Sequence, residues 1–407
     1  MASNSTLLII GGGLAGAKAA AGAREAGFEG RIVIVGEESH DPYERPPLSK
    51  EILRAEKASD SSRVNDSGHY AEHSVELITG DAVTSLDAGA KRAQLASGTS
   101  ISFDAAVLAT GAAPRKLTLP GADLAGVHYL RTIEDSVALH DAITKASRVA
   151  VIGAGWIGSE VAASARQLGA DVVLIEPLPA PLHRVLGTEV GSVFSQLHTD
   201  HGVAMRLGVG VAKLEGGSAV ERVVLEDGRV EAADVVVAGV GVTPRIELAE
   251  AAGLTIDNGV VVDQNLQSNA PGIFAAGDIA NAFHPHYQQH IRIEHWANAL
   301  NQGAAAGANA SGDPTPYTRL PYFFSDQYDL GLEYVGYASA DDEVVIRGDA
   351  GKREFIAFYH RGGIVTAAMN VNIWDVVDDL RAIITAGKRV DVAKMADPSV
   401  PLSELVS

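Results

Sequence analysis

The sequence of 407 residues contains no cysteine. Without thiols the chain forms no disulfide, binds no cysteine-ligated zinc or iron–sulfur cluster, and runs no Cys-x-x-Cys dithiol relay. Aromatic residues are few, at 5%, and 51 Asp and Glu outnumber 32 Lys and Arg, which gives a formal net charge of −19. This acidity argues against nucleic acid and anionic membrane as partners.

Long hydrophobic runs are missing as well. The apolar stretches are too short to cross a bilayer, and a predicted strand begins at Leu7 with no signal peptide before it, so we expect a cytoplasmic protein. The nearby histidines His284, His286 and His290 lack acids at ligand spacing, and no metal site is expected. A length of 407 residues with 46% hydrophobic residues, in Val/Ile runs and Ala/Leu segments, predicts an α/β protein of two or three domains.

Two glycine-rich motifs of the Gly-x-Gly-x-x-Gly type stand out. Each follows a short apolar run, opens an Ala-rich predicted helix, and precedes a second predicted strand that ends near an acid, Glu37 or Glu176. The glycines permit a tight turn, the approach of a pyrophosphate and close helix packing, while the acid accepts hydrogen bonds from a ribose. Two such units predict two dinucleotides and electron transfer between them. The motif glycines are Gly11, Gly13 and Gly16, and then Gly153, Gly155 and Gly158.

An internal duplication follows from a second repeated pattern. A strand that breaks into a glycine turn beside a proline occurs at 103–114 and again at 233–244. A further strand at 271–278 belongs to neither opening βαβ unit, so we expect the second unit to be inserted within the first, whose sheet resumes after residue 240. The predicted domains are 1–114 with 240–316, then 115–239, then a C-terminal α+β domain at 317–407.

The third domain is predicted from a change of pattern. A helix that begins near Glu294 ends at Gly312, before Pro314 and Pro316. Strands are then expected at 343–347, 354–359 and 364–370, followed by a helix at 374–385.

The motifs together resemble a known family. They are the paired glycine motifs, Thr110-Gly111, Gly277-Asp278, the segment Arg45-Pro-Pro-Leu-Ser-Lys50, and Phe324-Ser-Asp-Gln327. Over nearly its whole length the chain resembles the FAD-dependent NADH:ferredoxin reductases that serve cytochrome P450 and Rieske-type oxygenase systems. The resemblance implies the glutathione-reductase-like fold: two Rossmann-like dinucleotide-binding domains plus the C-terminal α+β domain.

The resemblance also implies which residues hold each nucleotide. Glu37 would contact the FAD ribose, Asp278 the ribityl chain, and Arg45 and Trp296 the flavin surroundings, with FAD bound non-covalently. The residues implied for FAD are Gly11, Gly13, Gly16, Glu37, Arg45, Lys50, Thr110, Gly111, Gly277, Asp278 and Trp296. The residues implied for NADH are Gly153, Gly155, Trp156, Ile157, Gly158, Glu160, Glu176, Arg184 and Gly241.

Four residues carry the expected chemistry. The resemblance places Lys50 and Glu160 as an ion pair next to flavin N5 and the nicotinamide, where a cation favours reduced flavin. The Trp156 ring either gates the nicotinamide pocket or simply packs. A carboxylate at Glu176 accepts bonds from a ribose 2′-hydroxyl and repels a 2′-phosphate, so NADH should be preferred over NADPH, with Arg184 near the adenosine end.

The expected function is hydride transfer from NADH to flavin N5, followed by single-electron transfer to a 2Fe–2S ferredoxin that feeds a P450 or Rieske oxygenase, an activity of the EC 1.18.1 type. The missing cysteines exclude the glutathione, lipoamide and mercuric reductase branches. Rubredoxin or monodehydroascorbate reduction remains an alternative, as does an apoptosis-inducing-factor-like redox sensor. We expect a monomer or weak homodimer.

The ferredoxin surface is predicted least directly. Phe324 stands where the family usually has Trp, a difference that bears on docking and electron exit. Because both partners are acidic, docking requires a local basic patch. The candidates are Arg54, Lys57, Arg63, Arg292 and Arg319.

Overall fold

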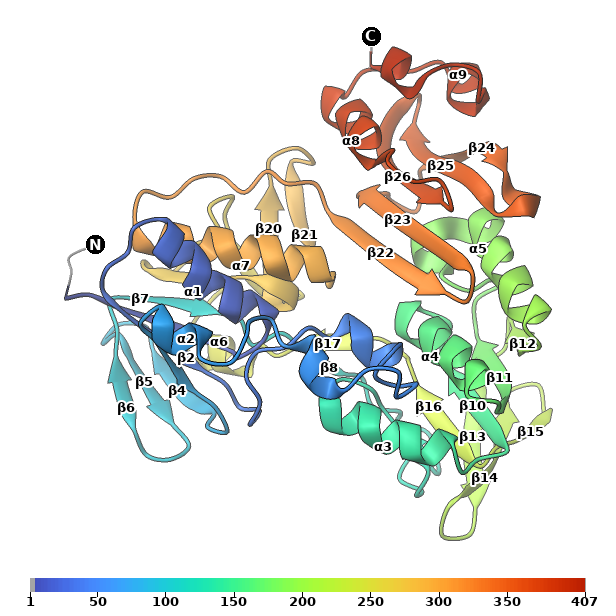
Figure 1. The fold of residues 1–407 in the computed structure, drawn as a ribbon, viewed down its shortest axis with the longest axis horizontal. Helices are drawn as coiled ribbons and strands as arrows, with labels where there is room; N and C mark the ends of the chain where they lie inside the picture. Colours follow the sequence, from blue (N-terminus) through green and yellow to red (C-terminus); the bar gives the residue numbers. More distant parts are fainter. Residues whose placement is uncertain (1–3, 407) are drawn as a thin grey trace. The chain divides into compact units, whose positions relative to one another are not determined.

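The computed structural model describes residues 4–406, which form two compact units (Figure 1). Residues 45–59, which carry Lys50, belong to the second unit although they follow the opening βαβ segment of the first in sequence. Each unit contains one of the glycine motifs. The first unit comprises residues up to Glu44, 60–113 and 243–321, and the second comprises 45–59, 114–242 and the residues from 322 onward.

A five-stranded parallel sheet, in the order β19-β7-β1-β2-β3, is the centre of the first unit. Its strands are continuous Val, Ile, Leu and Ala runs because a parallel sheet is covered on both faces. The late strand β19 pairs with β7, so the first sheet does resume after residue 240 as expected. The strands are β1 Thr6–Ile10, β2 Arg31–Val35, β3 Val75–Ile78, β7 Ala105–Leu108 and β19 Ile273–Ala275.

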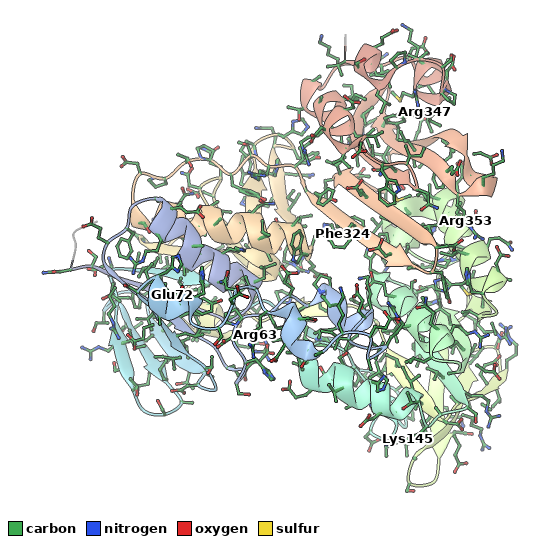
Figure 2. The ribbon with its side chains drawn as sticks, in the orientation of Figure 1. Arg63, Glu72, Lys145, Phe324, Arg347 and Arg353 are labelled. Carbon is green, nitrogen blue, oxygen red and sulfur yellow. The ribbon has the colours of Figure 1, made fainter. Side chains whose placement is uncertain are left out.

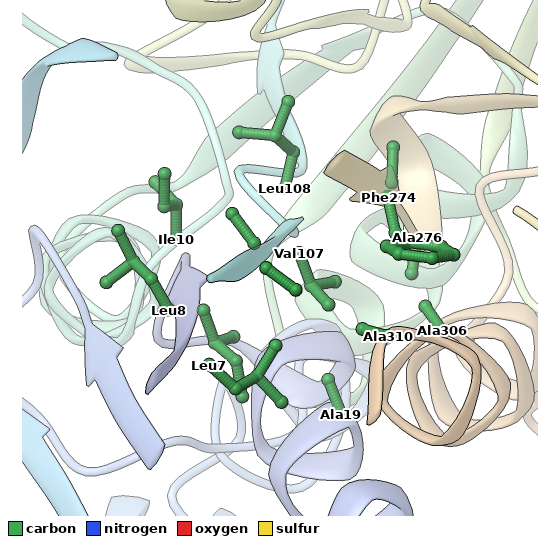
Figure 3. Close-up of a cluster of buried hydrophobic side chains, with 14 of the residues drawn as sticks. Leu7, Leu8, Ile10, Ala19, Val107, Leu108, Phe274, Ala276, Ala306 and Ala310 are labelled. Atoms are coloured by element: carbon green, nitrogen blue, oxygen red, sulfur yellow. The ribbon is translucent and has the colours of Figure 1, made fainter. Parts of the chain in front are cut away.

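Helices α1 (Leu14–Glu25) and α7 (Trp296–Ser311) pack closely against each other beside this sheet (Figure 3). Their facing residues are small: a Cβ on Gly307 would lie 1.8 Å from the Ala19 carbonyl oxygen, and one on Gly303 would lie 2.4 Å from that of Ala15. Close approach of the backbones therefore requires glycine at these positions. Helix α7 ends at Gly312 as predicted.

Smaller elements complete the first unit. They include two three-stranded sheets, β4-β5-β6 and β18-β20-β21, and short helical segments. The bounds are β4 Val83–Asp87, β5 Arg92–Leu95, β6 Ser100–Ser102, β18 Val260–Val262, β20 Ala280–His284, β21 Gln289–Arg292, η2 Ser59–Ser62, α2 His69–Glu72, α6 Glu247–Ala251 and η3 Gly277–Ile279. Strands β8 (Ala112–Pro114) and β17 (Val242–Pro244) pair with each other.

The second unit repeats the first sheet. Four parallel strands, β12-β11-β10-β16, follow the same order as β3-β2-β1-β7 of the first sheet. The fifth strand, β9, pairs with β16 but precedes β10 in the chain, whereas β19 follows β7. This repeat confirms the duplication that the sequence predicts. The bounds are β9 Val127–His128, α3 Ile133–Ile143, β10 Arg148–Ile152, α4 Trp156–Gln167, β11 Asp171–Glu176, α5 His183–Asp200, β12 Ala204–Leu207, β13 Val211–Gly216, β14 Val220–Leu225, β15 Val230–Ala232 and β16 Val235–Ala238.

The rest of the second unit is an antiparallel sheet, β22-β23-β26-β25-β24, which packs on helix α5 through a shared apolar cluster around Phe194 and Phe355. Arg353, beside this sheet, forms an ion pair with Asp200 of α5 (Figure 2). Strands β22 and β23 have no counterpart in the sequence-based prediction. The bounds are η1 Pro46–Ser49, β22 Tyr322–Gln327, β23 Leu330–Gly336, β24 Glu343–Asp349, η4 Ala350–Lys352, β25 Glu354–Arg361, β26 Ile364–Val371, α8 Val377–Ala386, α9 Val392–Ala396 and η5 Leu402–Leu405.

One predicted boundary is wrong. The helix expected from Trp374 begins at Val377, because Asn372 and Asp375 adopt left-handed backbone conformations that a helix does not continue through (φ 49° and 61°). Across residues 4–406, no helix combines the length and the apolar composition needed to cross a membrane.

Candidate active site

The first and third glycines of each motif are required by the protein itself. Gly11 has φ +126°, and a Cβ there would lie 2.1 Å from the Ala109 carbonyl oxygen. A Cβ on Gly16 would lie 2.0 Å from the Gly11 oxygen, and one on Gly158 would lie 1.9 Å from the Gly153 oxygen. These contacts fix the turn between strand and helix in both units.

The second glycine of each motif differs from the other two in its surroundings. Gly13 and Gly155 occupy the N-cap positions of α1 and α4 with ordinary φ angles of −93° and −74°. A Cβ added to either glycine would meet no described atom within 4 Å. The polypeptide itself therefore does not require glycine at these two positions. An open space at the helix N-terminus fits the pyrophosphate of a dinucleotide, so both motifs fit the nucleotides that the sequence predicts.

The two acids lie at different positions relative to their strands. Ile10 pairs with Val35 and Ile152 with Ile175, so Glu176 corresponds to Gly36, one residue before Glu37. Glu176 accepts hydrogen bonds from the Ala154 amide at 2.7 Å and from the Leu178 amide at 3.1 Å. This fixes the carboxylate next to the second glycine motif, where it could meet a ribose.

Glu37 is held by a side chain instead, in an ion pair with Arg245. Arg245 also binds the Thr110-Gly111 turn, because its amide donates to the Gly111 oxygen at 3.0 Å and its carbonyl accepts from the Thr110 hydroxyl at 3.0 Å. The sequence analysis missed Arg245. Its signal is the Pro-Arg pair that ends both copies of the turn: Arg115 likewise donates its amide to the Gly241 oxygen, at 2.9 Å.

The Gly277-Asp278 motif forms a short helical turn in the first unit. Gly277 has φ +77°, and its amide donates to the buried Gln302 of α7 at 3.1 Å. Burial lowers the pKa of His295 to about 4, an effect that the nearby Asp278 carboxylate opposes. Trp296 is the first residue of α7. The motif and the start of α7 are thus close together.

Lys50 and Glu160 form a buried ion pair within the second unit. The Lys50 Nζ lies 2.9 Å from Glu160 Oε1, and the two side chains keep only 10% and 6% of their surface exposed. Glu160 Oε1 also accepts from the Ser325 hydroxyl at 2.7 Å, and Oε2 accepts from the Ser49 hydroxyl at 2.5 Å. The Glu160 carboxylate therefore has three donors, one of which is cationic.

The segment that carries Lys50 is held by the helices of the second unit. The Ser136 hydroxyl of α3 donates to the Leu48 oxygen and the Ser164 hydroxyl of α4 to the Ser49 oxygen, both at 2.7 Å. The Arg45 guanidinium donates to the Arg131 oxygen at 2.5 Å. Two prolines before Lys50 stiffen the same segment. The position of Lys50 is therefore set by backbone contacts as well as by its partner.

Other predicted nicotinamide residues line the same end of α4 and α5. The Trp156 ring packs against Phe323 at 4.7 Å between centroids, and its indole N–H has no hydrogen-bond partner among the described residues. Ile157 and Arg184 are exposed. Phe324 lies on β22 with 38% of its surface exposed (Figure 2).

The candidate docking cations are mostly engaged by neighbouring acids. Arg54 pairs with Glu56 at 2.8 Å, Arg63 with Asp60 at 3.0 Å and Lys57 with Glu51 at 3.7 Å. The expectation that Arg292 lies on the surface is wrong: its side chain is 9% exposed and pairs with Glu294 at 2.6 Å. Arg319 is exposed.

The histidines of the β20–β21 hairpin have local partners. His284 Nε2 lies 3.0 Å from the Arg319 oxygen, and the His284 and His286 rings meet edge to face. Among the described residues, no group of three or more His, Cys, Asp or Glu side chains is arranged to hold a metal ion.

Comparison with known proteins agrees with this geometry. The family described as pyridine nucleotide-disulphide oxidoreductase matches residues 5–303, and the reductase C-terminal family matches 322–406. The chain is 39% identical over 401 residues to the ferredoxin--NAD(+) reductase component of the anthranilate 1,2-dioxygenase system of Burkholderia cepacia, covering 97% of this chain and 98% of that one.

Two solved structures are similar over almost the whole chain. The ferredoxin reductase for the CYP199A2 system of Rhodopseudomonas palustris superposes with a TM-score of 0.95 at 38% identity, covering 99% of this chain and 100% of that one. The reductase in the covalent putidaredoxin reductase–putidaredoxin complex gives 0.94 at 35% identity, covering 99% and 98%. The chain is therefore a member of the pyridine nucleotide-disulphide oxidoreductase family that carries the reductase C-terminal domain.

Proposed function

We propose that the chain is an FAD-containing NADH:ferredoxin reductase that supplies electrons to a P450 or Rieske oxygenase. The observation that carries this proposal is the pair of Rossmann sheets in which the second glycine of each motif faces open space. Two dinucleotide sites in one chain without cysteine suit an enzyme in which electrons pass directly from nicotinamide to flavin. The names of the relatives support ferredoxin as the acceptor.

FAD is assigned to the first unit. Bound FAD would accept two electrons as a hydride and give them up one at a time. The α1 N-terminus and Gly13 would receive the pyrophosphate, and Glu37 the ribose. The remaining residues assigned to FAD are Gly11, Gly16, Arg45, Lys50, Thr110, Gly111, Gly277, Asp278 and Trp296.

NADH is assigned to the second unit. Gly155 and the α4 N-terminus would receive its pyrophosphate, and Glu176, already oriented by two amides, would accept from the ribose hydroxyls. A fixed anion at this point repels a 2′-phosphate and so favours NADH over NADPH. The remaining residues assigned to NADH are Gly153, Trp156, Ile157, Gly158, Glu160, Arg184 and Gly241.

Lys50 and Glu160 are proposed to act as a unit. The buried carboxylate orients the ammonium, and the ammonium offers a positive charge to the electron-rich reduced cofactor. Low exposure of both groups excludes water from the pair and strengthens their interaction. We also place the enzyme in the cytoplasm, as a monomer or weak homodimer.

Anaerobic reduction by NADH tests the proposal. The purified yellow protein should contain one FAD per chain, lose its flavin absorbance within seconds of NADH addition, and pass electrons to a 2Fe–2S ferredoxin such as putidaredoxin. A protein that remains colourless after incubation with FAD would contradict the assignment. Rapid flavin reduction without ferredoxin reduction would favour the rubredoxin, monodehydroascorbate or sensor alternatives.

A further inference from the structure

A chain of buried hydrogen bonds connects the C-terminal domain to the Lys50–Glu160 pair. It runs from His198 of α5 through Gln327 and Ser325 of β22 to Glu160 of α4, and each of these side chains is at most 5% exposed. We propose that Ser325 is a positioning residue for the reaction, because its hydroxyl holds the carboxylate that orients Lys50. This inference rests on the function proposed above.

The distances define the chain. His198 Nε2 lies 3.0 Å from Gln327 Oε1, Gln327 Nε2 lies 3.5 Å from Ser325 Oγ, and Ser325 Oγ lies 2.7 Å from Glu160 Oε1. The last bond is the shortest, as expected for a hydroxyl that donates to a carboxylate. Lys50 Nζ approaches the same oxygen at 2.9 Å.

The direction of the chain is set by His198. Burial lowers the pKa of His198 to about 4, so at neutral pH the ring carries one proton. Its Nδ1 has no hydrogen-bond partner among the described residues, so a proton there would be a buried donor without an acceptor. The proton therefore belongs on Nε2, which donates to the Gln327 carbonyl oxygen. The Gln327 amide then donates to Ser325, and the Ser325 proton is directed to Glu160.

The consequence for Glu160 is that both carboxylate oxygens are occupied. Ser325 and Lys50 share Oε1, and Ser49 donates to Oε2. Without the Ser325 hydroxyl the carboxylate can rotate and the charged form loses one donor. Another titratable group that interacts with this pair is Asp326, on the outer side of β22. Partial burial raises the pKa of Asp326, Lys50 lowers it, and Glu160 and Glu51 raise it further.

The test compares Ser325→Ala with Thr366→Val. Thr366 of β26 is a matched control, because it also donates a hydroxyl to a buried carboxylate, that of Asp342 just before β24, at 2.8 Å. In stopped-flow reduction of the FAD-loaded enzyme by NADH, Ser325→Ala should lower the limiting rate about tenfold with little change in the apparent Kd for NADH. The acid limb of its rate–pH profile should move upward by about one pH unit.

Thr366→Val should change neither the limiting rate nor the profile, although both variants lose some thermal stability. Gln327→Met provides a second measurement, because it frees the Ser325 hydroxyl without removing it. We expect a two- to threefold lower rate and a smaller shift of the rate–pH profile than in Ser325→Ala, because the Ser325 hydroxyl then points to Glu160 only part of the time. Ser325→Thr retains the hydroxyl and should restore the wild-type profile.

Equal rates and profiles for Ser325→Ala and wild type would overturn the inference, as would identical effects of Ser325→Ala and Thr366→Val. If Ser325→Ala does not fold, the test uses Gln327→Met instead. A rate–pH profile of Gln327→Met that equals the wild-type profile would then overturn the inference. Failure of wild-type flavin to accept electrons from NADH would instead contradict the proposed function.

Discussion

The two dinucleotide-binding sheets share the order of four strands, but the acid that follows the second strand of each motif lies at a different position and has different partners. In the first sheet, Gly36 follows the second strand and lies against Gly12, with Glu37 one residue further on. In the second sheet, Glu176 occupies the position of Gly36, and its carboxylate binds the Ala154 amide, which corresponds to Gly12. One copy brings two backbones together at this point, and the other places a fixed negative charge there.

The helices that follow the motifs differ as well. Two residues after the third glycine, α1 has the half-buried Lys18 and α4 has the buried Glu160. Helix α1 packs against α7 through glycines, whereas α4 carries polar groups that bind Lys50, Ser49 and Ser325. This difference agrees with the proposal that the first copy binds FAD and the second binds NADH.

The largest expected effect comes from filling the open space at each motif. Gly13→Val should yield protein without bound FAD, while Gly155→Val should keep FAD and lose at least about 100-fold in kcat/KM for NADH, or about 3 kcal/mol. Flavin content and NADH kinetics measure the two effects. Gly16→Ala is the control for a glycine that the fold itself needs and should not fold stably, because its Cβ would lie 2.0 Å from an oxygen. Retention of full activity in Gly155→Val would place the pyrophosphate elsewhere.

Breaking the buried ion pair between Lys50 and Glu160 should have the next largest effect, on the free energy of unfolding. Lys50→Met leaves the Glu160 carboxylate buried without its cation, which should lower the free energy of unfolding by about 3 kcal/mol. The double variant Lys50→Met/Glu160→Gln should recover part of this loss. Lys18→Met, at the position of the first copy that corresponds to Glu160, should change stability by less than about 0.5 kcal/mol. Urea denaturation of the FAD-loaded proteins measures all three, and equal losses for Lys50→Met and Lys18→Met would contradict the prediction.

Removing the fixed charge at Glu176 should change coenzyme preference. Glu176→Gln keeps an acceptor but removes repulsion of a 2′-phosphate, so the ratio of kcat/KM for NADH to that for NADPH should fall by about 10- to 100-fold. Glu37→Gln should leave this ratio unchanged and weaken only FAD retention. A ratio unaffected by Glu176→Gln would show that this acid does not meet the adenosine ribose of the nicotinamide coenzyme.

The smallest expected effect is on stability in acid. It arises from α5, which is much longer than α2, the helix before the corresponding strand β3 of the first copy. Burial lowers the pKa of His198 on α5 to about 4, from an ordinary value of 6.5. Below pH 6.5 the unfolded chain binds a proton that the folded protein refuses, so stability falls as the pH drops toward 4. From pH 7 to pH 5 the loss should be about 1–2 kcal/mol, measured by urea denaturation. His198→Asn should flatten this dependence, and an equally steep loss in that variant would assign it to other groups.

The sequence predicts most of the architecture but less of the active site. The glycine motifs and Val/Ile runs predict both parallel sheets, because burial on two faces makes such strands apolar throughout. Strand β22 is not predicted, because its buried side consists of Phe323, Ser325 and Gln327. Two of these three residues are polar, whereas the alternating pattern of a half-buried strand has apolar residues on the buried side. The sequence does not predict the contact of Arg245 with Glu37 or that of Ser325 with Glu160, because in each pair the partners lie more than a hundred residues apart in the chain.

Strand β19 also has a consequence for how the protein is made. It completes the first sheet by pairing with β7, yet the whole second Rossmann sheet is encoded between the two strands. A nascent chain emerging from the ribosome can form the local β1–α1–β2 segment early, but the edge of that sheet at β7 stays open until residue 275 has been synthesised. Such late, long-range pairing is slow and leaves an apolar edge exposed during synthesis. Residues 1–113 should therefore depend on chaperones more than residues 145–240, in which strands β10, β11, β12 and β16 pair with one another.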